Sequence, residues 1–445
     1  MISAMYGLFN RSIKLSYLGN FNDKQSPEYC MTLKLRFQLS LMMFLEFFMK
    51  GSWFVTLGTY LKSNLGASAL EVSNIFSTQS LGAVVAPFFI GFIADRYFNA
   101  ERVMGVLHLI GAGLLLMMYR ADSAAGIYPY VLLYFIGYMS TLALTSSVAF
   151  RNLTNPQKQY PSIRIFGTIG WVVAGFAISY LFHWDTQEAV AAGALHKTFL
   201  LGAACSAVLG LLCFLLPATP PLKKNQSSFD WQDALGLQAL KLLRQKSFLI
   251  FFLTAIVICI PISFYYQHTN PFLVATGLPN PTAKMALGQL SEALCLLLIP
   301  LLFARLGYKK MILLGIAAWA LRYLLFAYGN GQDLSFMLIL GIVLHGICYD
   351  FMFVVGQIYT NNIAGEQYRS SAQGLVTVAM YGVGMLIGFW IAGFVADALK
   401  AYEGTRYWRY LWLTPAAMAT VCLLLFAGLF KEQQPGVSKE VQQQL

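Results

Sequence analysis

An arginine, a threonine and a tryptophan lie along one stripe of an apolar stretch. Arg164, Thr168 and Trp171 are four and three residues apart, so a helix places them on one face. An arginine inside a membrane helix is costly if it faces lipid, so Arg164 should face a polar cavity or a partner. A cation, a hydroxyl and an aromatic ring suit a polar solute with a flat ring. The alternative is that Arg164 reaches the membrane interface and Trp171 packs on a neighbouring helix.

Acidic residues inside apolar stretches form a second candidate set. Glu292 lies three residues after Gln289, and a helix points both side chains the same way. An amide and a carboxylate together can hydrogen-bond ribose hydroxyls or the edge of a base. A carboxylate in a low-dielectric cavity favours its neutral form, so Glu292 can load and release a proton. A purely structural acid is the alternative for Glu292.

A further group of polar residues lies in the stretch that contains Asp350. His345 and Tyr349 share one helical face, and Asp350 lies about 100° away, towards a neighbouring helix. Arg322 is one candidate partner, so Asp350 either serves transport or forms a buried salt bridge that holds the second half together. His345 either contributes to the site or is a satisfied core histidine.

Two more helices carry polar residues inside apolar runs. Ser263 and Tyr266 follow Pro261, and a proline inside a span often bends a helix beside a cavity. The aromatic side chains there stack on a flat ring or fill the core. Glu46 and Lys50 are four residues apart, so they can neutralise each other within one helix.

The composition identifies the class of protein. The chain has 445 residues, of which 58% are hydrophobic and 11% charged, against about 25% charged in soluble domains. The chain is therefore a polytopic membrane protein. The net charge of +11 is concentrated in loops, which argues against nucleic-acid binding. The seven cysteines and five histidines lack metal-ligand, CxxC or HExxH spacing, so no metal, cofactor or enzymatic activity is expected.

Runs of about 20 apolar residues indicate membrane-spanning helices, and alternation typical of a barrel is missing. We predict an all-α membrane protein with twelve such helices: 37–61, 72–94, 101–120, 127–150, 162–184, 196–217, 247–273, 283–304, 310–328, 334–360, 370–396 and 408–430.

The distribution of basic residues predicts the orientation and the domains. With both termini cytoplasmic, the cytoplasmic segments hold 20 of the 30 Lys and Arg residues and the opposite side holds seven. A basic connection, with an amphipathic helix over 233–243, divides the chain into two six-helix bundles. Met31 is the expected natural start, and a genuine cytoplasmic tail is the alternative. The predicted segments are an N-terminal segment 1–36, a bundle 37–218, the central loop 219–246, a bundle 247–430 and a cytoplasmic tail 431–445.

Short basic turns occur at matching places in the two halves. Gly91, Asp95 and Arg96 form a glycine-containing turn in which the acid and the base can latch neighbouring helix ends. A weaker copy lies at 305–310. With twelve spans and a basic central loop, these turns resemble the inner-loop signature of the major facilitator superfamily, although the first copy lacks the usual trailing basic pair.

From Met31 onward the chain resembles the nucleoside:proton symporter family of that superfamily. The resemblance is carried by 51–58, 138–142, 162–170, 289–292, 321–329 and 371–374.

That resemblance implies inward transport of nucleosides, driven by the proton gradient, through alternating access. It implies that Arg164, Thr168, Gln289 and Glu292 line the nucleoside site and that the family aspartate is kept at Asp350. The family's pattern differs at four positions of the shell that contacts the ring, which puts the substrate range in doubt. These positions are Ser263, Tyr266, His345 and Tyr349.

The resulting hypothesis is a monomeric, multi-pass nucleoside:proton symporter of a bacterial inner membrane, surrounded by lipid. Glu292 is the leading proton carrier and Asp350 the second proton-coupling candidate. One alternative is a facilitator for another polar solute, such as a sugar or a modified nucleoside. A non-transporting membrane receptor is the alternative from a different class.

Overall fold

The computed structural model describes residues 32–89, 97–221 and 237–431, and all regular structure in these ranges is helical. The predicted extension before Met31 lies outside the described residues. The predicted latch residues Gly91, Asp95 and Arg96 also lie outside them.

Six long helical segments form the first half of the chain, and they agree with the predicted spans to within several residues. Two of them are interrupted, because α2 stops before α3 and α7 continues as a short π-helix. Two short helices, α8 (Gln187–Ala191) and η4 (Ala194–His196), precede the last segment. The six segments are α2 (Leu33–Phe54) with α3 (Leu57–Ser63), α4 (Ala69–Phe89), α5 (Ala100–Arg120), α6 (Ala124–Arg151), α7 (Pro156–Phe176) with η3 (Ala177–Leu181), and α9 (Lys197–Cys213).

The second half begins with η5 (Leu237–Arg244), a 3-10 helix in the described part of the central connection. Its Ala239 and Leu242 are buried whereas Leu240 is exposed, in keeping with the predicted amphipathic segment. The elements that follow are α11 (Lys246–Ala275), α12 (Pro281–Tyr328), α13 (Ser335–Val343), α14 (His345–Tyr349), η6 (Asp350–Val354), α15 (Val355–Thr377), η7 (Val378–Gly384), α16 (Met385–Ala398) and α17 (Gly404–Leu429).

Two glycines divide the longest helical elements of the second half. α12 breaks at Gly307, where φ is 68°, and α15 breaks at Gly365, where φ is 65°. Only glycine adopts this backbone conformation without strain. The 48 residues of α12 are about twice the length that a bilayer needs, so Gly307 separates two of the predicted spans.

The described helices account for the predicted twelve. Ten continuous segments are long and apolar enough to cross a membrane. Dividing α12 at Gly307 gives eleven, and α4, which lies between α3 and α5, gives the twelfth.

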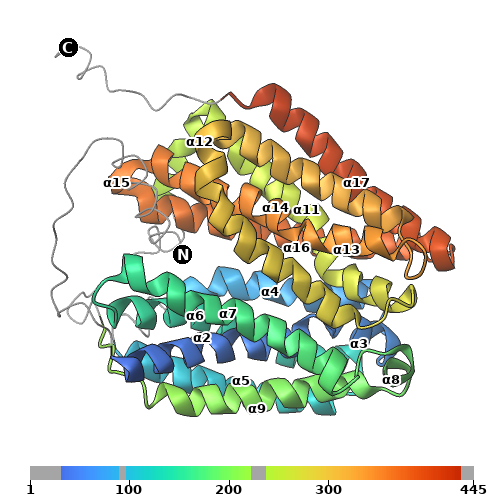
Figure 1. Cartoon of the computed structure of the whole chain (residues 1–445), viewed down its shortest axis with the longest axis horizontal. Coiled ribbons are helices and arrows are strands. Elements are labelled where there is room, and N and C mark those ends of the chain that lie inside the picture. The colour runs from blue at the N-terminus through green and yellow to red at the C-terminus, as the bar shows by residue number, and fades with distance from the viewer. Residues whose placement is uncertain (1–31, 90–96, 222–236, 432–445) are drawn as a thin grey trace.

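The two halves lie side by side as separate groups of helices, blue to green and yellow to red in Figure 1. Helix α7 packs on α12, α4 on α16, and α3 on α11 across the boundary. These contacts bring the stripe that contains Arg164 next to the second half.

Candidate functional site

Close packing of α7 on α2 fixes the stripe that begins with Arg164. At Gly170, an added Cβ would collide with the carbonyl oxygen of Phe44, so the two helices touch through backbone. The Arg164 guanidinium carbon lies 4.2 Å from the centre of the Phe47 ring, a cation–π contact. The Trp171 ring packs beside Gly51, one turn further along α2. The predicted stripe therefore faces α2 and the centre of the protein rather than lipid alone.

Glycine contacts in the second half fix the position of Glu292. An added Cβ on Gly346 of α14 would collide with the backbone of Ser291 on α12. The Gly346 amide instead donates a hydrogen bond of 2.9 Å to the Ser291 hydroxyl. This contact locks α12 to α14 at the residue next to Glu292. Glu292 is half-buried on α12, the helix that packs on α7, and lies near enough to Arg164 to feel its charge.

Three tyrosines of the second half lie near enough to Glu292 to feel its charge: Tyr266, Tyr349 and Tyr381. The hydroxyls of Tyr349 and Tyr381 are hydrogen-bonded to each other. The Tyr266 ring lies 6.1 Å from the ring of Phe54, which belongs to the first half. The predicted aromatic residues Tyr266 and Tyr349 thus lie in the same region of the second half as the predicted proton carrier. We call Arg164, Glu292, Tyr266, Tyr349 and Tyr381 the central cluster.

Asp350 starts the π-helix η6 and is fully buried. Neither of its carboxylate oxygens has a hydrogen-bond partner among the described residues. Glu292 lies near enough to Asp350 for the two acids to interact electrostatically. An isolated ionised carboxylate is very costly to bury, so burial favours the neutral acid at Asp350. A single π-helical turn is also common at functional sites.

Arg322, considered above as a partner for Asp350, binds elsewhere. Its guanidinium Nη1 lies 3.1 Å from Nδ1 of His345, and Nη2 donates to the Ile342 carbonyl oxygen at 3.5 Å. The guanidinium carbon is 3.7 Å from the centre of the Tyr265 ring, on which the His345 ring also stacks at 5.5 Å. The candidate salt bridge between Arg322 and Asp350 does not form in this conformation, because arginine, imidazole and phenol form a stack instead.

Ser263 is not brought to the central cluster. Its hydroxyl donates to the Cys259 carbonyl oxygen at 2.9 Å and to the Met385 carbonyl oxygen at 3.3 Å, so it joins α11 to α16. His345 is buried in its stack with Arg322. Thr168 and Gln289 are half-buried on α7 and α12.

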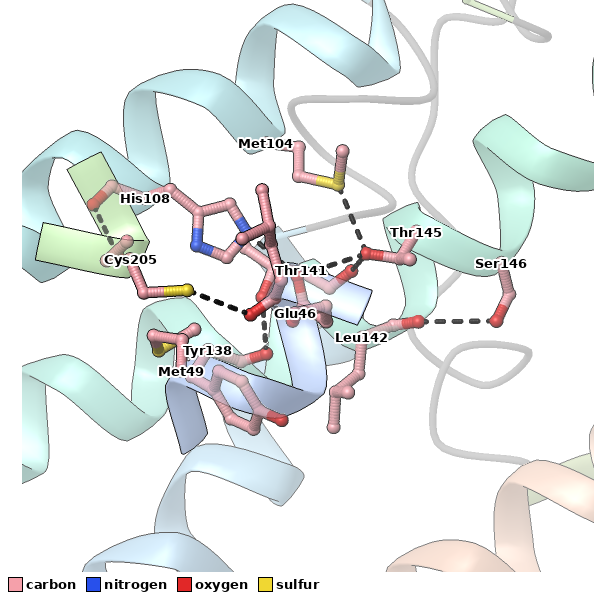
Figure 2. Close-up of polar contacts among 12 residues, drawn as sticks. Glu46, Met49, Met104, His108, Tyr138, Thr141, Leu142, Thr145, Ser146 and Cys205 are labelled. Carbon is pink, nitrogen blue, oxygen red and sulfur yellow. Dashed lines mark hydrogen bonds and ion pairs between the residues drawn. The ribbon is translucent and has the colours of Figure 1, made fainter. Parts of the chain in front are cut away.

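The intrahelical pair expected between Glu46 and Lys50 does not form. Glu46 Oε2 lies 2.8 Å from His108 Nε2, and Thr141 donates to Oε1 at 2.8 Å. Thr145 donates to Oε2 at 3.3 Å, and Figure 2 shows these side chains converging on Glu46 from α5 and α6. We call Glu46, His108, Thr141 and Thr145 the Glu46 cluster. This cluster could not be predicted from the sequence, because its members lie on three different helices.

Hydrogen bonds between the halves gather at the end of the molecule remote from Leu33 and Leu429. Asp185 accepts from the Ser179 hydroxyl at 2.6 Å and from the Thr282 amide at 2.9 Å. Further hydrogen bonds across the boundary pair Thr59 with Asn270, Lys62 with His268, Ser73 with Gln267, Gln187 with Val274 and Ser179 with Ala283. We call this set the outer seal. Asp185 is its most connected member and was missed by the sequence analysis, since it lies in a polar loop.

Comparison with known proteins identifies the family. Residues 33–435 match the family described as nucleoside H⁺ symporter. YegT of Escherichia coli (strain K12) is 37% identical over 410 residues, which cover 90% of this chain and 95% of YegT. Nucleoside permease NupG of the same organism is 29% identical over 414 residues, which cover 90% of this chain and 96% of NupG.

Solved structures agree with this relationship. The crystal structure of a mutant of the nucleoside transporter NupG superposes with a TM-score of 0.82 at 29% identity, covering 89% of this chain and all of that one. A peptide-type POT family transporter, at 15% identity and a TM-score of 0.66, shares the fold alone. The predicted all-α major facilitator fold is confirmed, and the relatives are transporters rather than enzymes. The chain belongs to the nucleoside H⁺ symporter family.

Proposed function

We propose that the chain imports nucleosides together with protons by alternating access, and that the central cluster is the nucleoside site. The observation that carries this proposal is the packing of α7, which carries Arg164, on α12, which carries Glu292, across the boundary between the halves. A solute bound between these two residues contacts both halves at once. Its binding can therefore be coupled to their relative movement.

Within this site each residue has a chemical role. Arg164 and Gln289 anchor the sugar or the base, and Thr168 adds a hydrogen bond. Trp171, Tyr266 and Tyr349 pack on the rings. In this conformation Ser263 and His345 hold neighbouring helices in place and do not contact the substrate. The Ser263 hydroxyl binds the carbonyls of Cys259 and Met385, and His345 binds Arg322.

Proton coupling follows from the competition for Arg164. When Glu292 is ionised, it attracts the Arg164 guanidinium and competes with the substrate for it. Protonation removes this attraction and frees Arg164 to bind the nucleoside. Release of the proton on the less acidic side restores the attraction and favours release of the substrate. Asp350, buried beside Glu292 without a hydrogen-bond partner, is the second proton-coupling residue.

The outer seal supports an assignment of the conformation. The described hydrogen bonds between the halves lie at the end remote from Leu33 and Leu429. With both termini cytoplasmic, as the basic loops indicate, this arrangement is closed to the outside. We place the protein in a bacterial inner membrane, as a monomer surrounded by lipid.

The test is uptake of labelled uridine and adenosine into proteoliposomes that contain the full chain. We expect accumulation with an imposed inward proton gradient and its collapse on addition of a protonophore. Uptake that ignores the gradient would leave a facilitator without proton coupling. Absence of uptake of either nucleoside would refute the proposed substrate class.

The role of Glu292 is tested with Glu292→Gln, which keeps the shape of the side chain and removes its charge. We expect loss of gradient-driven accumulation with retained exchange of nucleoside across the membrane. Glu403→Gln is the matched control, because Glu403 is exposed at the start of α17. Full accumulation by Glu292→Gln would exclude Glu292 as the proton carrier.

A further inference from the structure

Lys50 is a buried lysine in the middle of α2, and among the described residues no carboxylate lies within ion-pair distance of its ammonium. Its side chain is 9% exposed, and its ammonium lies 4.7, 4.9 and 5.5 Å from the ring centres of Phe54, Tyr138 and Phe135. Among the described residues it has no hydrogen bond and no ion pair. Glu46, the acid one turn earlier, is bound by His108 and is not within ion-pair distance of Lys50.

The face of α2 that carries Lys50 is the face that meets the central cluster. Residues 47, 50, 51 and 54 follow the helical repeat and share one side. Phe47 contacts Arg164, Gly51 packs beside Trp171, and Phe54 contacts Tyr266 across the boundary between the halves. Lys50 stands between these three contacts. Its ammonium is therefore adjacent to the space in which we place the nucleoside.

Three aromatic rings do not satisfy an ammonium fully. Cation–π contacts supply attraction to the charge, but the three N–H donors of Lys50 still lack an acceptor. A buried charge is normally paired or hydrogen-bonded, because desolvation without compensation is costly. A negatively charged ligand that enters the site would provide both the charge and the acceptor.

We propose that Lys50 binds a negatively charged group on the base of the transported nucleoside and that the chain prefers such nucleosides to neutral ones. This proposal rests on the proposed function. The base is favoured over a phosphate because Lys50 is a single cation enclosed by three flat, apolar rings. A phosphate dianion needs several donors to replace its hydration, whereas a flat base with one delocalised charge fits between rings.

The test measures inhibition of labelled uridine uptake in proteoliposomes that contain the full chain. The two competitors are 5-carboxyuridine and 5-carbamoyluridine, which have nearly the same shape and differ by one negative charge. We expect wild type to bind the carboxylate more tightly. Lys50→Met, which keeps length and removes charge, should lower the ratio of the two inhibition constants by about 10-fold, the size of one charge-assisted hydrogen bond.

Two variants serve as controls. Lys50→Arg keeps the charge and should retain the preference for the carboxylate to within a few-fold. Lys310→Met removes an exposed lysine and should leave the ratio unchanged. If Lys50→Met shows no uptake, the same ratio is measured with purified protein as the increase in melting temperature caused by each competitor.

The possible results separate this proposal from the proposed function. Uridine uptake by wild type with an unchanged ratio in Lys50→Met would overturn the role of Lys50 alone. Competition by uridine 5′-monophosphate that depends on Lys50, without competition by 5-carboxyuridine, would overturn the choice of the base and indicate a phosphate. Absence of nucleoside uptake by wild type would refute the proposed function and this proposal with it.

Discussion

Removing His108 should destabilise the protein, because it leaves the Glu46 carboxylate buried with only hydroxyl donors. The side chains of His108 and Glu46 are 3% and 0% exposed, and their closest N and O atoms are 2.8 Å apart. Loss of one member of such a pair typically costs about 3–5 kcal/mol of unfolding free energy. We therefore expect His108→Leu to lower stability by that amount.

The expected change in melting temperature follows from the size of the described chain. The roughly 380 described residues, at about 2.1 cal/mol/K each, give an unfolding entropy near 0.8 kcal/mol/K. A loss of 3–5 kcal/mol then lowers Tm by about 4–6 °C. The assay is thermal unfolding of the purified full chain in detergent, with Glu403→Met as the control for an exposed acid.

A double variant distinguishes an unpaired charge from simple loss of packing. Replacing both residues, as Glu46→Met with His108→Leu, removes the lone charge, so most of the stability should return. The threonine hydroxyls stay satisfied, because Thr141 also donates to Tyr138 O and Thr145 to Thr141 O. A drop below about 1 °C in His108→Leu, or additive losses in the double variant, would refute this account.

Three further predictions concern the outer seal, the packing beside Glu292 and the second buried acid. Asp185→Ala removes two hydrogen bonds to a carboxylate. It should raise by about 10-fold or more the rate at which a thiol reagent added outside labels the cysteine of Thr59→Cys. An unchanged rate would contradict the proposed closure. Gly346→Ala should reduce uridine uptake because its Cβ meets the backbone of α12, whereas Gly374→Ala, with open space around it, should not; equal uptake by both would contradict the packing argument. Asp350→Asn should reduce proton-driven accumulation while Tm changes by less than about 2 °C, since the Asp350 carboxylate has no partner to lose; a larger drop in Tm would reveal a structural salt bridge.

Much of the fold follows from the sequence, because a membrane allows few solutions. Runs of apolar residues long enough to span it gave the twelve helices. The stripe that contains Arg164 and the buried acids could be recognised because polar residues are rare and costly in such runs. The same argument led to Arg164 and Glu292, which lie on α7 and α12, helices of opposite halves that pack on each other.

Pairings between helices were not predictable in the same way. Glu46 and Lys50 share a helical face, so spacing alone favoured a pair within the helix. The structure pairs Glu46 with His108, which is 62 positions away, and Arg322 with His345 rather than with Asp350. Helical spacing specifies which residues share a face, whereas the identity of the neighbouring face depends on how the helices pack.

The breaks at Gly307 and Gly365 have a consequence for biogenesis. At each break two helical segments meet at a single residue with positive φ, without a loop between them. Such a junction has no spare residues, so we expect the two segments on either side to enter the bilayer together as a hairpin rather than one after the other. We expect insertions at either glycine to block membrane integration, even of short and polar sequences that ordinary connecting loops tolerate.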